Sequence, residues 1–499
     1  MTVIYFFSVF IVATCGLIYE LVIGALASYL LGDSITQFST VIGTYLFAMG
    51  VGSYLSKYIN RNLIYMFVKI EILIGLIGGF SATILFALFD HVSSFRILLY
   101  SLIFIIGVLV GVEIPLVMKI LKDRVEFNKL VSHVFSVDYI GALLASLAFP
   151  LLLVPHLGLV RTSFLFGLLN AGVAFMTLIL FNEEVKKGKA LHAFSIFSIF
   201  ILLMGFIFSS RITEFTEQMA YNDQVIYSHS TLYQKILITK NPHEMKLFLN
   251  GNLQFSSRDE YRYHEPLVHP GLASLPNPKN ILILGGGDGL AAREVLKYPS
   301  VEKITLVDLD EKMTQIFRQN NLLEPLNHDS LNNPKLTVIN ADAFEWIRKD
   351  TSKYDFVIVD FPDPTNFSLG KLYTQKFYSE LKSRVADDGL IVVQSTSPFV
   401  ARKAFWCIET TIRSAGFKTY PYHVYVPSFG EWGYVIATLG KAYQPPKIFP
   451  ADLKFINAEV TADMFMFPPD MAAVHVDINK LNNQALVRYF EDEWSHYTQ

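Results

Sequence analysis

The chain has 499 residues, of which 52% are hydrophobic and only 17% are charged. This composition is too apolar for an ordinary soluble enzyme of this size, so a chain that is soluble throughout is excluded. The formal net charge of −3 gives no basic excess to neutralise phosphates, which sets aside a nucleic-acid partner.

The first part of the chain is a series of long apolar runs. Each run approaches the roughly 20 residues that a helix needs to cross a hydrocarbon core about 30 Å thick. We therefore predict an α-helical transmembrane bundle of about seven spans over residues 1–210, followed by a short amphipathic linker at 211–223. The spans are expected at residues 4–31, 37–56, 63–89, 96–120, 132–155, 158–181 and 192–208.

Charged sequence with frequent turns follows, and it begins with two hairpin patterns. They cover Val225–Thr239 and Met245–Phe255, and the second contains the turn signal Asn250-Gly251. A helix is expected from Asp259. We assign residues 224–275 to an N-terminal β-hairpin subdomain.

Strand and helix patterns then alternate over residues 276–499, and a helical tail closes the chain. Strands alternating with helices predict a doubly wound, parallel Rossmann-like α/β sheet, whose ligand crevice lies at the carboxyl ends of the strands. Two late apolar runs, Tyr422–Val426 and Gly433–Leu439, are expected to pair antiparallel at one edge. The parallel strands are expected at Asn280–Leu284, Lys303–Asp308, Leu336–Asn340, Asp355–Asp360 and Leu390–Gln394.

A glycine-rich turn follows the first of these strands in ILILGGGDG, residues 281–289. Glycine lets the backbone approach a ligand closely, which makes Gly285 and Gly287 candidate binding residues. Twenty residues beyond Asp288, Asp308 ends the next strand, where a ribose diol binds in nucleotide-binding α/β folds. The alternative is that the glycines only tighten a turn.

Further acids follow the third and fourth strands, namely Asp342 and then Asp360 and Asp363 within DFPDP. Acids gathered in one crevice raise one another's pKa, which is unfavourable unless a cation binds there. The expected ligand is therefore both a nucleoside and cationic, as an adenosyl sulfonium is. Acids near its amino-acid tail would repel the carboxylate of ordinary S-adenosylmethionine, which favours a decarboxylated donor and an amine acceptor. No metal site is predicted, because Cys15 and Cys407 have no metal-ligand spacing.

Eight segments between residue 224 and about residue 440 occur in an order typical of one family. They are Tyr233-Gln234, LFLNGNLQ at 247–254, DEYRYHE at 259–265, GGGDG, VDLDE, NADAFEW, the Asp-x-x-Asp-Pro segment and LYTQKFY. On these segments the soluble part resembles the spermidine synthase family, the polyamine aminopropyltransferases. Residues 16–57 resemble multi-pass membrane segments fused to such domains in bacteria, so the resemblance covers nearly the whole chain.

The resemblance implies transfer of an aminopropyl group from decarboxylated S-adenosylmethionine to a diamine, putrescine by default, giving spermidine and methylthioadenosine. The donor is a co-substrate, and no covalently bound cofactor is expected. It further implies that Asp360 accepts a proton from the amine, because a protonated primary amine cannot attack. Donor binding is assigned to Gln234, Gly285, Gly287, Asp308, Asp342 and Ala343. The amine and aminopropyl channel is assigned to Tyr263, His264, Asp288 and Asp363.

Some positions depart from the family pattern. Phe361, Pro362, Asn366 and Phe367 stand where the family has small hydroxyl residues and Gly-Pro. The segment VPSFGEWGY, residues 426–434, differs where members present a tyrosine to the acceptor. The donor side is therefore better supported than the acceptor side, and several residues also have a plain structural interpretation: packing for Tyr263 and His264, and turn initiation for Asp363.

Two other functions stay open. The first is a membrane transferase or cyclase that uses S-adenosylmethionine, or its decarboxylated form, on another nucleophile. The second is a polyamine transporter or sensor whose synthase-like domain only binds. Retention of Asp360 argues against the second, since binding alone needs no proton acceptor. A homodimer is expected, with membrane lipid as the other partner of the chain.

Four acids fall inside the apolar spans, where an ionised side chain costs a few kcal/mol. They are Glu20, Glu71, Glu113 and Asp138. One interpretation is structural, with Lys69 and Lys119 as pairing partners. The other is an intramembrane path or dock for a cationic polyamine, because spaced carboxylates match spaced ammonium groups.

The loop charges conflict with the expected chemistry. Basic residues in alternate loops place the N-terminus in the cytoplasm by the positive-inside rule, and seven spans then place the catalytic domain outside. The adenosyl sulfonium donor is made in the cytoplasm, so we expect a multi-pass cell-membrane protein with a cytoplasmic catalytic domain. The basic residues are Lys57, Arg61, Lys119, Lys122, Arg124, Lys129, Lys186, Lys187 and Lys189.

Overall fold

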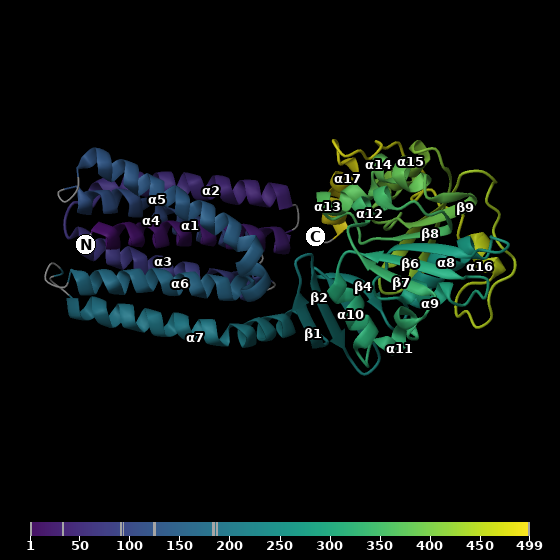
Figure 1. Cartoon of the computed structure of the whole chain (residues 1–499), viewed down its shortest axis with the longest axis horizontal. Helices are drawn as coiled ribbons and strands as arrows, with labels where there is room; N and C mark the ends of the chain where they lie inside the picture. Colours follow the sequence, from purple (N-terminus) through teal and green to yellow (C-terminus); the bar gives the residue numbers. More distant parts are fainter. Residues whose placement is uncertain are drawn as a thin grey trace. The chain divides into compact units, whose positions relative to one another are not determined.

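The computed structural model describes residues 2–31, 34–89, 92, 94–122, 126–181, 185 and 188–497. The chain divides into two compact units, Met1–Asp223 and Gln224–Gln499, and each is treated by itself below (Figure 1). Three of the basic loop residues, Arg124, Lys186 and Lys187, lie outside the described residues.

The first unit consists of long helices that contact one another along their length (Figure 1). Six helical segments of its described part are long and apolar enough to cross a membrane. A 3₁₀ turn, η1 (Ser56–Tyr58), follows α2, and residues 211–220 of the expected linker continue α7. The helices are α1 (Thr2–Leu31), α2 (Ser34–Leu55), α3 (Leu63–Leu88), α4 (Phe95–Leu121), α5 (Phe127–Ala148), α6 (Val154–Leu180) and α7 (Gly188–Ala220).

One of the six segments, Lys129–Leu180, contains two of the expected spans. Its 52 residues would make a straight helix of roughly 78 Å, far longer than a hydrocarbon core of about 30 Å. A π-helical turn, η2 (Phe149–Leu153), and the non-helical Gly158 (φ 72°, ψ 175°) interrupt it. This combination of φ and ψ requires glycine, so the sequence itself sets the kink at Gly158 within α6.

Small residues bring the helices of the first unit close together. A methyl group on Gly75 of α3 would lie 2.8 Å from the carbonyl oxygen of Gly167 in α6, and one on Gly52 of α2 would lie 2.0 Å from that of Val108 in α4. Larger side chains at these positions would force the backbones apart.

A four-stranded antiparallel sheet begins the second unit, in the order β1-β2-β3-β4. Its strands are β1 (Gln224–Ser230), β2 (Lys235–Lys240), β3 (Met245–Leu249) and β4 (Asn252–Ser256), and α8 (Tyr261–Leu272) follows. Asn250 and Gly251 form the turn between β3 and β4, with φ of 51° and 83°. Both residues tolerate this left-handed backbone, which explains why the second hairpin was readable from the sequence.

The large sheet has the order β10-β11-β9-β8-β5-β6-β7. Strands β5 to β9 are parallel, whereas β10 and β11 run antiparallel at one edge, as predicted. This mixed sheet agrees with the predicted Rossmann-like fold. The strands are β5 (Asn280–Gly285), β6 (Lys303–Asp308), β7 (Leu336–Asn340), β8 (Tyr354–Asp360), β9 (Val385–Gln394), β10 (Lys418–Val426) and β11 (Gly430–Thr438).

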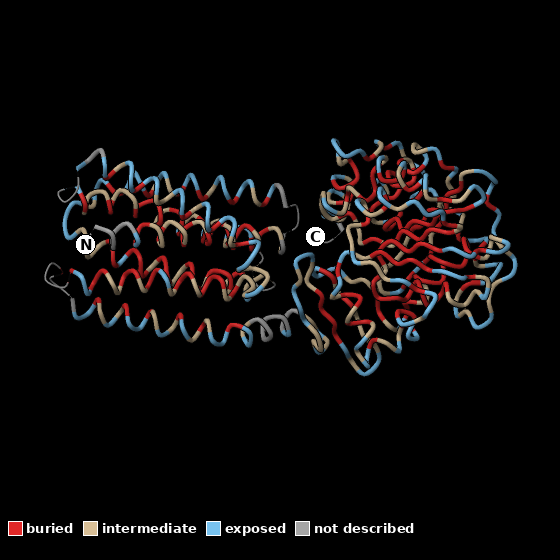
Figure 2. The backbone as a smooth tube through the Cα atoms, viewed as in Figure 1, coloured by how far each residue is buried: buried red, intermediate tan, exposed pale blue. Residues whose placement is uncertain are grey.

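Helices cover both faces of this sheet, so its central strands are apolar on both sides. Ile281 and Ile283 of β5 enter one core, while Leu282 and Leu284 enter the other. Figure 2 shows these strands as almost entirely buried. The helices are α9 (Leu290–Val295), α10 (Glu311–Gln319), α11 (Glu324–Asn327), α12 (Ala343–Lys349), α13 (Phe367–Gly370), α14 (Gln375–Lys382), α15 (Arg402–Ser414), α16 (Ala458–Asp463) and α17 (Ala485–Tyr497), with 3₁₀ turns η3 (Ser330–Asn332) and η4 (Lys371–Tyr373).

The strand order reverses between β5 and β8, because β6 and β7 extend the sheet on one side and β9 extends it on the other. Such a switch point is where α/β sheets bind ligands. Gly285 and Asp360 are paired in register there.

Candidate active site

The turn after β5 lies between two carboxylates. Gly285 and Gly286 have φ of 84° and 64°, in the left-handed region that favours glycine. A methyl group on Gly286 would lie 3.3 Å from Oδ2 of Asp360, and one on Gly287 only 2.6 Å from Oδ2 of Asp308. The glycines are therefore needed both for the shape of the turn and for the close approach of the two acids.

Asp308 ends β6 and is held by backbone N–H groups. Gly287 N donates to its Oδ2 at 3.1 Å, and Asp310 N donates to its Oδ1 at 2.9 Å. Burial raises the pKa of Asp308 to about 6, and the charges of Asp310 and Asp288 act in the same direction while the two backbone bonds oppose them. Each carboxylate oxygen still has a lone pair free for another donor, such as a ribose hydroxyl.

Gln234 reaches the same region from the small sheet. Its Nε2 donates to Oδ2 of Asp310 at 3.1 Å, and Thr231 Oγ1 donates to that oxygen at 2.8 Å. The other oxygen of Asp310 caps α10 by accepting from Lys312 N at 3.0 Å. Asp310 thus attaches the small sheet to the loop after β6, a role that the sequence analysis missed although the residue lies within VDLDE.

Asp342 has a basic partner of its own. Its Oδ1 caps α12 by accepting from Phe344 N at 2.8 Å, and Lys371 Nζ donates to its Oδ2 at 2.6 Å. Partial burial alone would raise its pKa, but the ion pair with Lys371 holds it below the usual value. Asp342, followed by the buried Ala343, therefore differs from the other predicted acids.

Asp360 is half-buried at the end of β8, and Tyr263 Oη donates to its Oδ1 at 2.6 Å. Burial raises the pKa of Asp360 to about 6; the charge of His264 and the tyrosine bond oppose this, and the charge of Asp288 adds to it. An acid of this kind is mainly ionised at neutral pH yet accepts a proton readily.

His264 belongs to a buried ionic network. Its Nδ1 lies 2.9 Å from the carbonyl oxygen of Glu260 and 3.0 Å from Oε2 of the same residue, so this nitrogen carries a proton. Arg293 donates two hydrogen bonds to the Glu260 carboxylate, from Nη1 to Oε1 at 3.0 Å and from Nη2 to Oε2 at 2.8 Å. Although burial favours neutral imidazole, Glu260 raises the pKa of His264. The same histidine interacts electrostatically with Asp288 and Asp360.

Asp288 follows the glycine turn and is 9% exposed. Its Oδ1 accepts from Leu290 N at 2.9 Å. Burial raises its pKa, and the charge of His264 opposes that shift. Asp288 also interacts electrostatically with Asp308 and Asp360, so it lies among the other acids of the site.

Asp363 is surrounded by weak hydrogen bonds. Gln394 Nε2 and Thr396 Oγ1 each lie 3.4 Å from one of its carboxylate oxygens. Burial raises the pKa of Asp363 to about 7, although the hydrogen bonds from Gln394 and Thr396 act to lower it. Gln394 Nε2 also donates to Phe361 O at 2.6 Å. Phe361, which departs from the family pattern, packs on Phe377 with ring centroids 5.7 Å apart and so belongs to the core.

Aromatic side chains from the β10–β11 hairpin surround Tyr263. The rings of Phe429, Trp432 and Tyr434 lie 6.0, 6.4 and 5.7 Å from it, and Tyr434 Oη donates to Tyr263 O at 3.1 Å. Nε1 of Trp432 is buried and finds no hydrogen-bond partner within the described part of the chain. Phe429, Trp432 and Tyr434 form an aromatic wall beside Tyr263. In the sequence, the two-residue spacing of Trp432 and Tyr434 indicates it, because this spacing puts both side chains on one face of a strand.

The structure therefore brings most of the predicted site together at the switch point. Tyr263, His264, Asp288, Asp308 and Asp360 are linked by the contacts above, with Asp363 beyond the end of β8. Gln234 and Asp342 lie on the β6–β7 side, each with a partner. The residues that the sequence analysis missed are Glu260, Arg293, Asp310, Lys371, Gln394, Thr396, Phe429 and Trp432.

Known proteins similar to this chain belong to one family. The spermine/spermidine synthase domain model matches residues 260–448. A polyamine aminopropyltransferase of Leptospira interrogans is 53% identical over 98% of both chains, and polyamine aminopropyltransferase 2 of Ralstonia nicotianae is 51% identical over 98% of this chain and 97% of its own. A crystal structure of spermidine synthase in complex with the transition state analogue AdoDATO is 32% identical, with a TM-score of 0.47, and covers 49% of this chain and 85% of its own.

The chain belongs to the polyamine aminopropyltransferase family, which confirms the predicted resemblance. The match to the curated relatives extends over the helical unit as well as the Rossmann-like unit, since it covers 98% of the chain.

Proposed function

We propose that this protein transfers an aminopropyl group from decarboxylated S-adenosylmethionine to a diamine, with putrescine as the default acceptor. The products are spermidine and methylthioadenosine. The observation that carries the proposal is the position of Asp360: an acid with a raised pKa, hydrogen-bonded to Tyr263, at the switch point of the sheet. The names of the full-length relatives support it.

The donor occupies the β5–β6–β7 side in this proposal. Asp308 accepts from the ribose hydroxyls, the turn at Gly285 and Gly287 allows close approach, and Gln234 with Asp342 and Ala343 surrounds the adenosine. The acids Asp288 and Asp360 attract the sulfonium and would repel a carboxylate on the donor, which favours the decarboxylated form.

The amine occupies the side of Tyr263 and Asp363. Its distal ammonium group is held by Asp363, whose weak hydrogen bonds leave it available for a cation. The attacking nitrogen gives its proton to Asp360 and forms a bond to the methylene carbon beside the sulfonium. The carbon–sulfur bond breaks with its electrons on sulfur, so methylthioadenosine leaves as a neutral thioether.

The test is release of methylthioadenosine by the purified full chain. Turnover is expected only with the decarboxylated donor and a di- or polyamine, and Asp360→Asn should reduce kcat by about 10² to 10⁴. Asp388→Asn is the matched control, because this acid is exposed near the start of β9, whereas the site residue Gln394 ends that strand. Turnover with intact S-adenosylmethionine on another nucleophile would favour the transferase or cyclase alternative. Binding of the donor and the amine without turnover would favour the transporter or sensor alternative.

We propose further that the first unit spans the cell membrane. Large apolar side chains on its surface support this, among them Phe47, Ile97 and Leu151, each about two-thirds exposed. A cytoplasmic catalytic unit follows from the supply of the donor, against the loop charges. Alkaline phosphatase fused after Gln499 should be inactive, and activity there would place the catalytic unit outside.

The family resemblance also underlies a proposed homodimer. Light scattering on the detergent-solubilised full chain should give twice the mass of the protomer, after subtraction of detergent. The protomer mass alone would contradict it.

A further inference from the structure

A cluster of polar side chains is buried within the first unit. Glu71 of α3 and Glu113 of α4 are 0% and 2% exposed and interact with each other. Tyr19 of α1 is buried completely and interacts electrostatically with both carboxyl groups. Asn170 of α6 is 1% exposed. Four helices thus contribute buried polar side chains to this region of the first unit.

Several hydrogen-bonding atoms of this cluster are unusually free. Within the described residues, the carboxyl groups of Glu71 and Glu113 share a hydrogen bond with each other, whereas no partner is found for Oη of Tyr19 or for either polar atom of Asn170. Buried polar atoms are hydrogen-bonded in the great majority of cases, so each exception needs a reason. Tyr19 and Asn170 are two such exceptions and both pack against α3, which favours a polar ligand beside the two glutamates.

The packing of α3 places these groups on one face. The ring of Tyr19 lies against Gly78, where a methyl group would approach it to 2.5 Å, and Asn170 lies against Gly75, with its Cβ 3.4 Å from such a methyl group. Glu71, Gly75 and Gly78 are four and three residues apart, so they share a face of the helix. The hydroxyl group of Tyr19 and the amide group of Asn170 therefore lie beside the face of α3 that carries Glu71.

Neither lysine considered in the sequence analysis neutralises the pair. Lys119 Nζ donates to the carbonyl oxygens of Ser56 and Ile59 at 2.6 and 2.9 Å, and Lys69 is exposed. Among the described residues, no salt bridge involves Glu71 or Glu113. Two adjacent buried carboxyl groups can be ionised only if a cation compensates them.

Other titratable groups surround the pair. Tyr45 interacts with Glu20, Glu113 and Asp138, and its Oη donates to Gly16 O at 2.8 Å. Cys15 interacts with both glutamates, and its thiol donates to Phe166 O at 3.6 Å. All of these neighbours are acidic or neutral, so none supplies the compensating charge.

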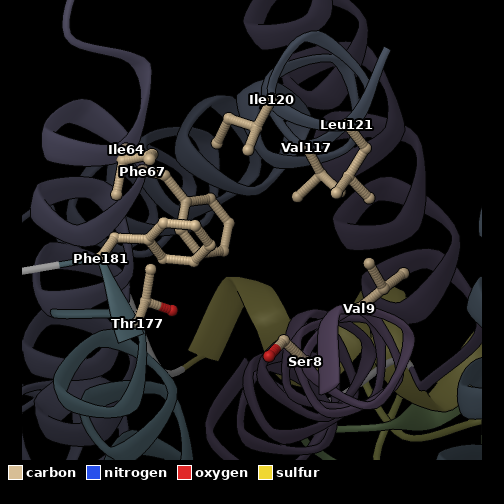
Figure 3. Close-up of a pocket in the computed structure, with 9 residues that line it drawn as sticks. All are labelled: Ser8, Val9, Ile64, Phe67, Val117, Ile120, Leu121, Thr177 and Phe181. Carbon is tan, nitrogen blue, oxygen red and sulfur yellow. The ribbon is translucent and has the colours of Figure 1, made fainter. Parts of the chain in front are cut away.

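A cavity lies near one end of the helices of the first unit (Figure 3). Phe67 and Val117 in its wall are each four residues, about one turn or roughly 5 Å, from Glu71 and Glu113. Its lining is carbon except for the hydroxyl groups of two residues. The lining residues are Ser8, Val9, Ile64, Phe67, Val117, Ile120, Leu121, Thr177 and Phe181.

We propose that this cluster is a second binding site, which takes an alkylammonium cation in exchange for protons of Glu71 and Glu113. The three N–H donors of the ammonium group meet oxygens of Glu71, Glu113 and Tyr19. The methylene chain lies along the apolar cavity. The choice of a polyamine as the natural ligand rests on the proposed function, whereas the cation site itself rests on the geometry of the first unit.

Equilibrium dialysis of radiolabelled spermidine against the full chain in detergent tests the site. The wild type should bind about two equivalents, one in each unit. The double variant Glu71→Gln/Glu113→Gln should bind only one equivalent of spermidine, in the second unit, and its kcat should be unchanged. The double variant Asp360→Asn/Asp363→Asn should also bind one equivalent, in the first unit. Glu126→Gln, at an exposed acid, is the matched control and should keep both.

An indicator dye in weak buffer should report proton release on spermidine addition in the wild type and none in Glu71→Gln/Glu113→Gln. Retention of both equivalents in that variant overturns the site, and release of protons by NaCl alone overturns the choice of an organic ammonium. If the double variant Glu71→Gln/Glu113→Gln fails to fold, Tyr19→Phe provides the test. The affinity of the first unit for spermidine should then fall by about threefold to tenfold, and unchanged affinity overturns the proposal. Loss of turnover in the wild type with binding kept would count only against the proposed function.

Discussion

Tyr263 and Asp360 are 97 residues apart in the sequence and are joined by a hydrogen bond of 2.6 Å from Oη to Oδ1. The bond occupies one oxygen of the acid, while Oδ2 faces the glycine turn. It favours the ionised form of Asp360 against the effect of burial. The tyrosine therefore both orients the proton acceptor and sets its basicity.

Removal of this hydroxyl should shift the acid limb of the pH profile. In Tyr263→Phe the pKa of Asp360 should rise above about 6, because one interaction that lowers it is lost. Turnover at pH 7 should fall by roughly tenfold and recover in part at higher pH. The measurement is kcat against pH, with the exposed Tyr425→Phe as control. An unchanged acid limb would show that the hydroxyl does not act on Asp360.

The acids of the site should make the unliganded unit less stable as pH rises. Asp363 has its pKa raised by burial to about 7 from 3.8, so the folded state prefers the protonated form. Its stabilising contribution is complete below about pH 4 and is lost as pH rises through about 7. Asp363→Asn should therefore exceed the wild type in Tm at pH 8, with the difference vanishing by pH 4. A difference that stays constant with pH would contradict this assignment.

Glu260 should be the most sensitive residue of the buried ionic network. Although burial opposes it, bonds from His264 and Arg293 lower the pKa of Glu260 to about 2. Glu260→Gln removes the carboxylate shared by His264 and Arg293 and leaves Arg293 paired with Glu294 alone, so it should destabilise the unit by about 1–3 kcal/mol in urea denaturation. The control is Glu302→Gln, which breaks only an exposed pair and should change stability by less than about 1 kcal/mol. Equal losses in both variants would rule out a structural role for the network.

Strand ends and turns could be predicted because they depend on local pattern. Asp308 and Asp360 end apolar runs in the sequence, and the glycine turn and the Asn250-Gly251 turn carry residues suited to positive φ. The antiparallel edge formed by β10 and β11 was predicted for the same reason, since two apolar runs lie close together.

Partners brought together by the tertiary fold could not be predicted. Lys371 neutralises Asp342 across 29 residues, and Arg293 reaches Glu260 across 33. Nothing in the local pattern distinguishes these basic residues from others on helices. The expectation that Asp342 is an uncompensated acid was therefore too simple, and the aromatic wall beside Tyr263 was missed because a hairpin far along the chain provides it.

Discrimination at the donor tail should depend on Asp288. This acid interacts electrostatically with Asp308 and Asp360; burial raises its pKa, and the charge of His264 opposes that shift. Asp288→Asn removes one charge that repels the carboxylate of S-adenosylmethionine. The preference for the decarboxylated donor, measured as the ratio of the two Kd values, should fall by roughly threefold to tenfold, a change of about 0.7–1.4 kcal/mol, while aminopropyl transfer slows. Asp355→Asn, whose carboxylate accepts only from backbone N–H groups at the opposite end of the sheet, should leave the ratio unchanged. If Asp288→Asn weakened both donors by the same factor, charge repulsion would not be the basis of donor selection.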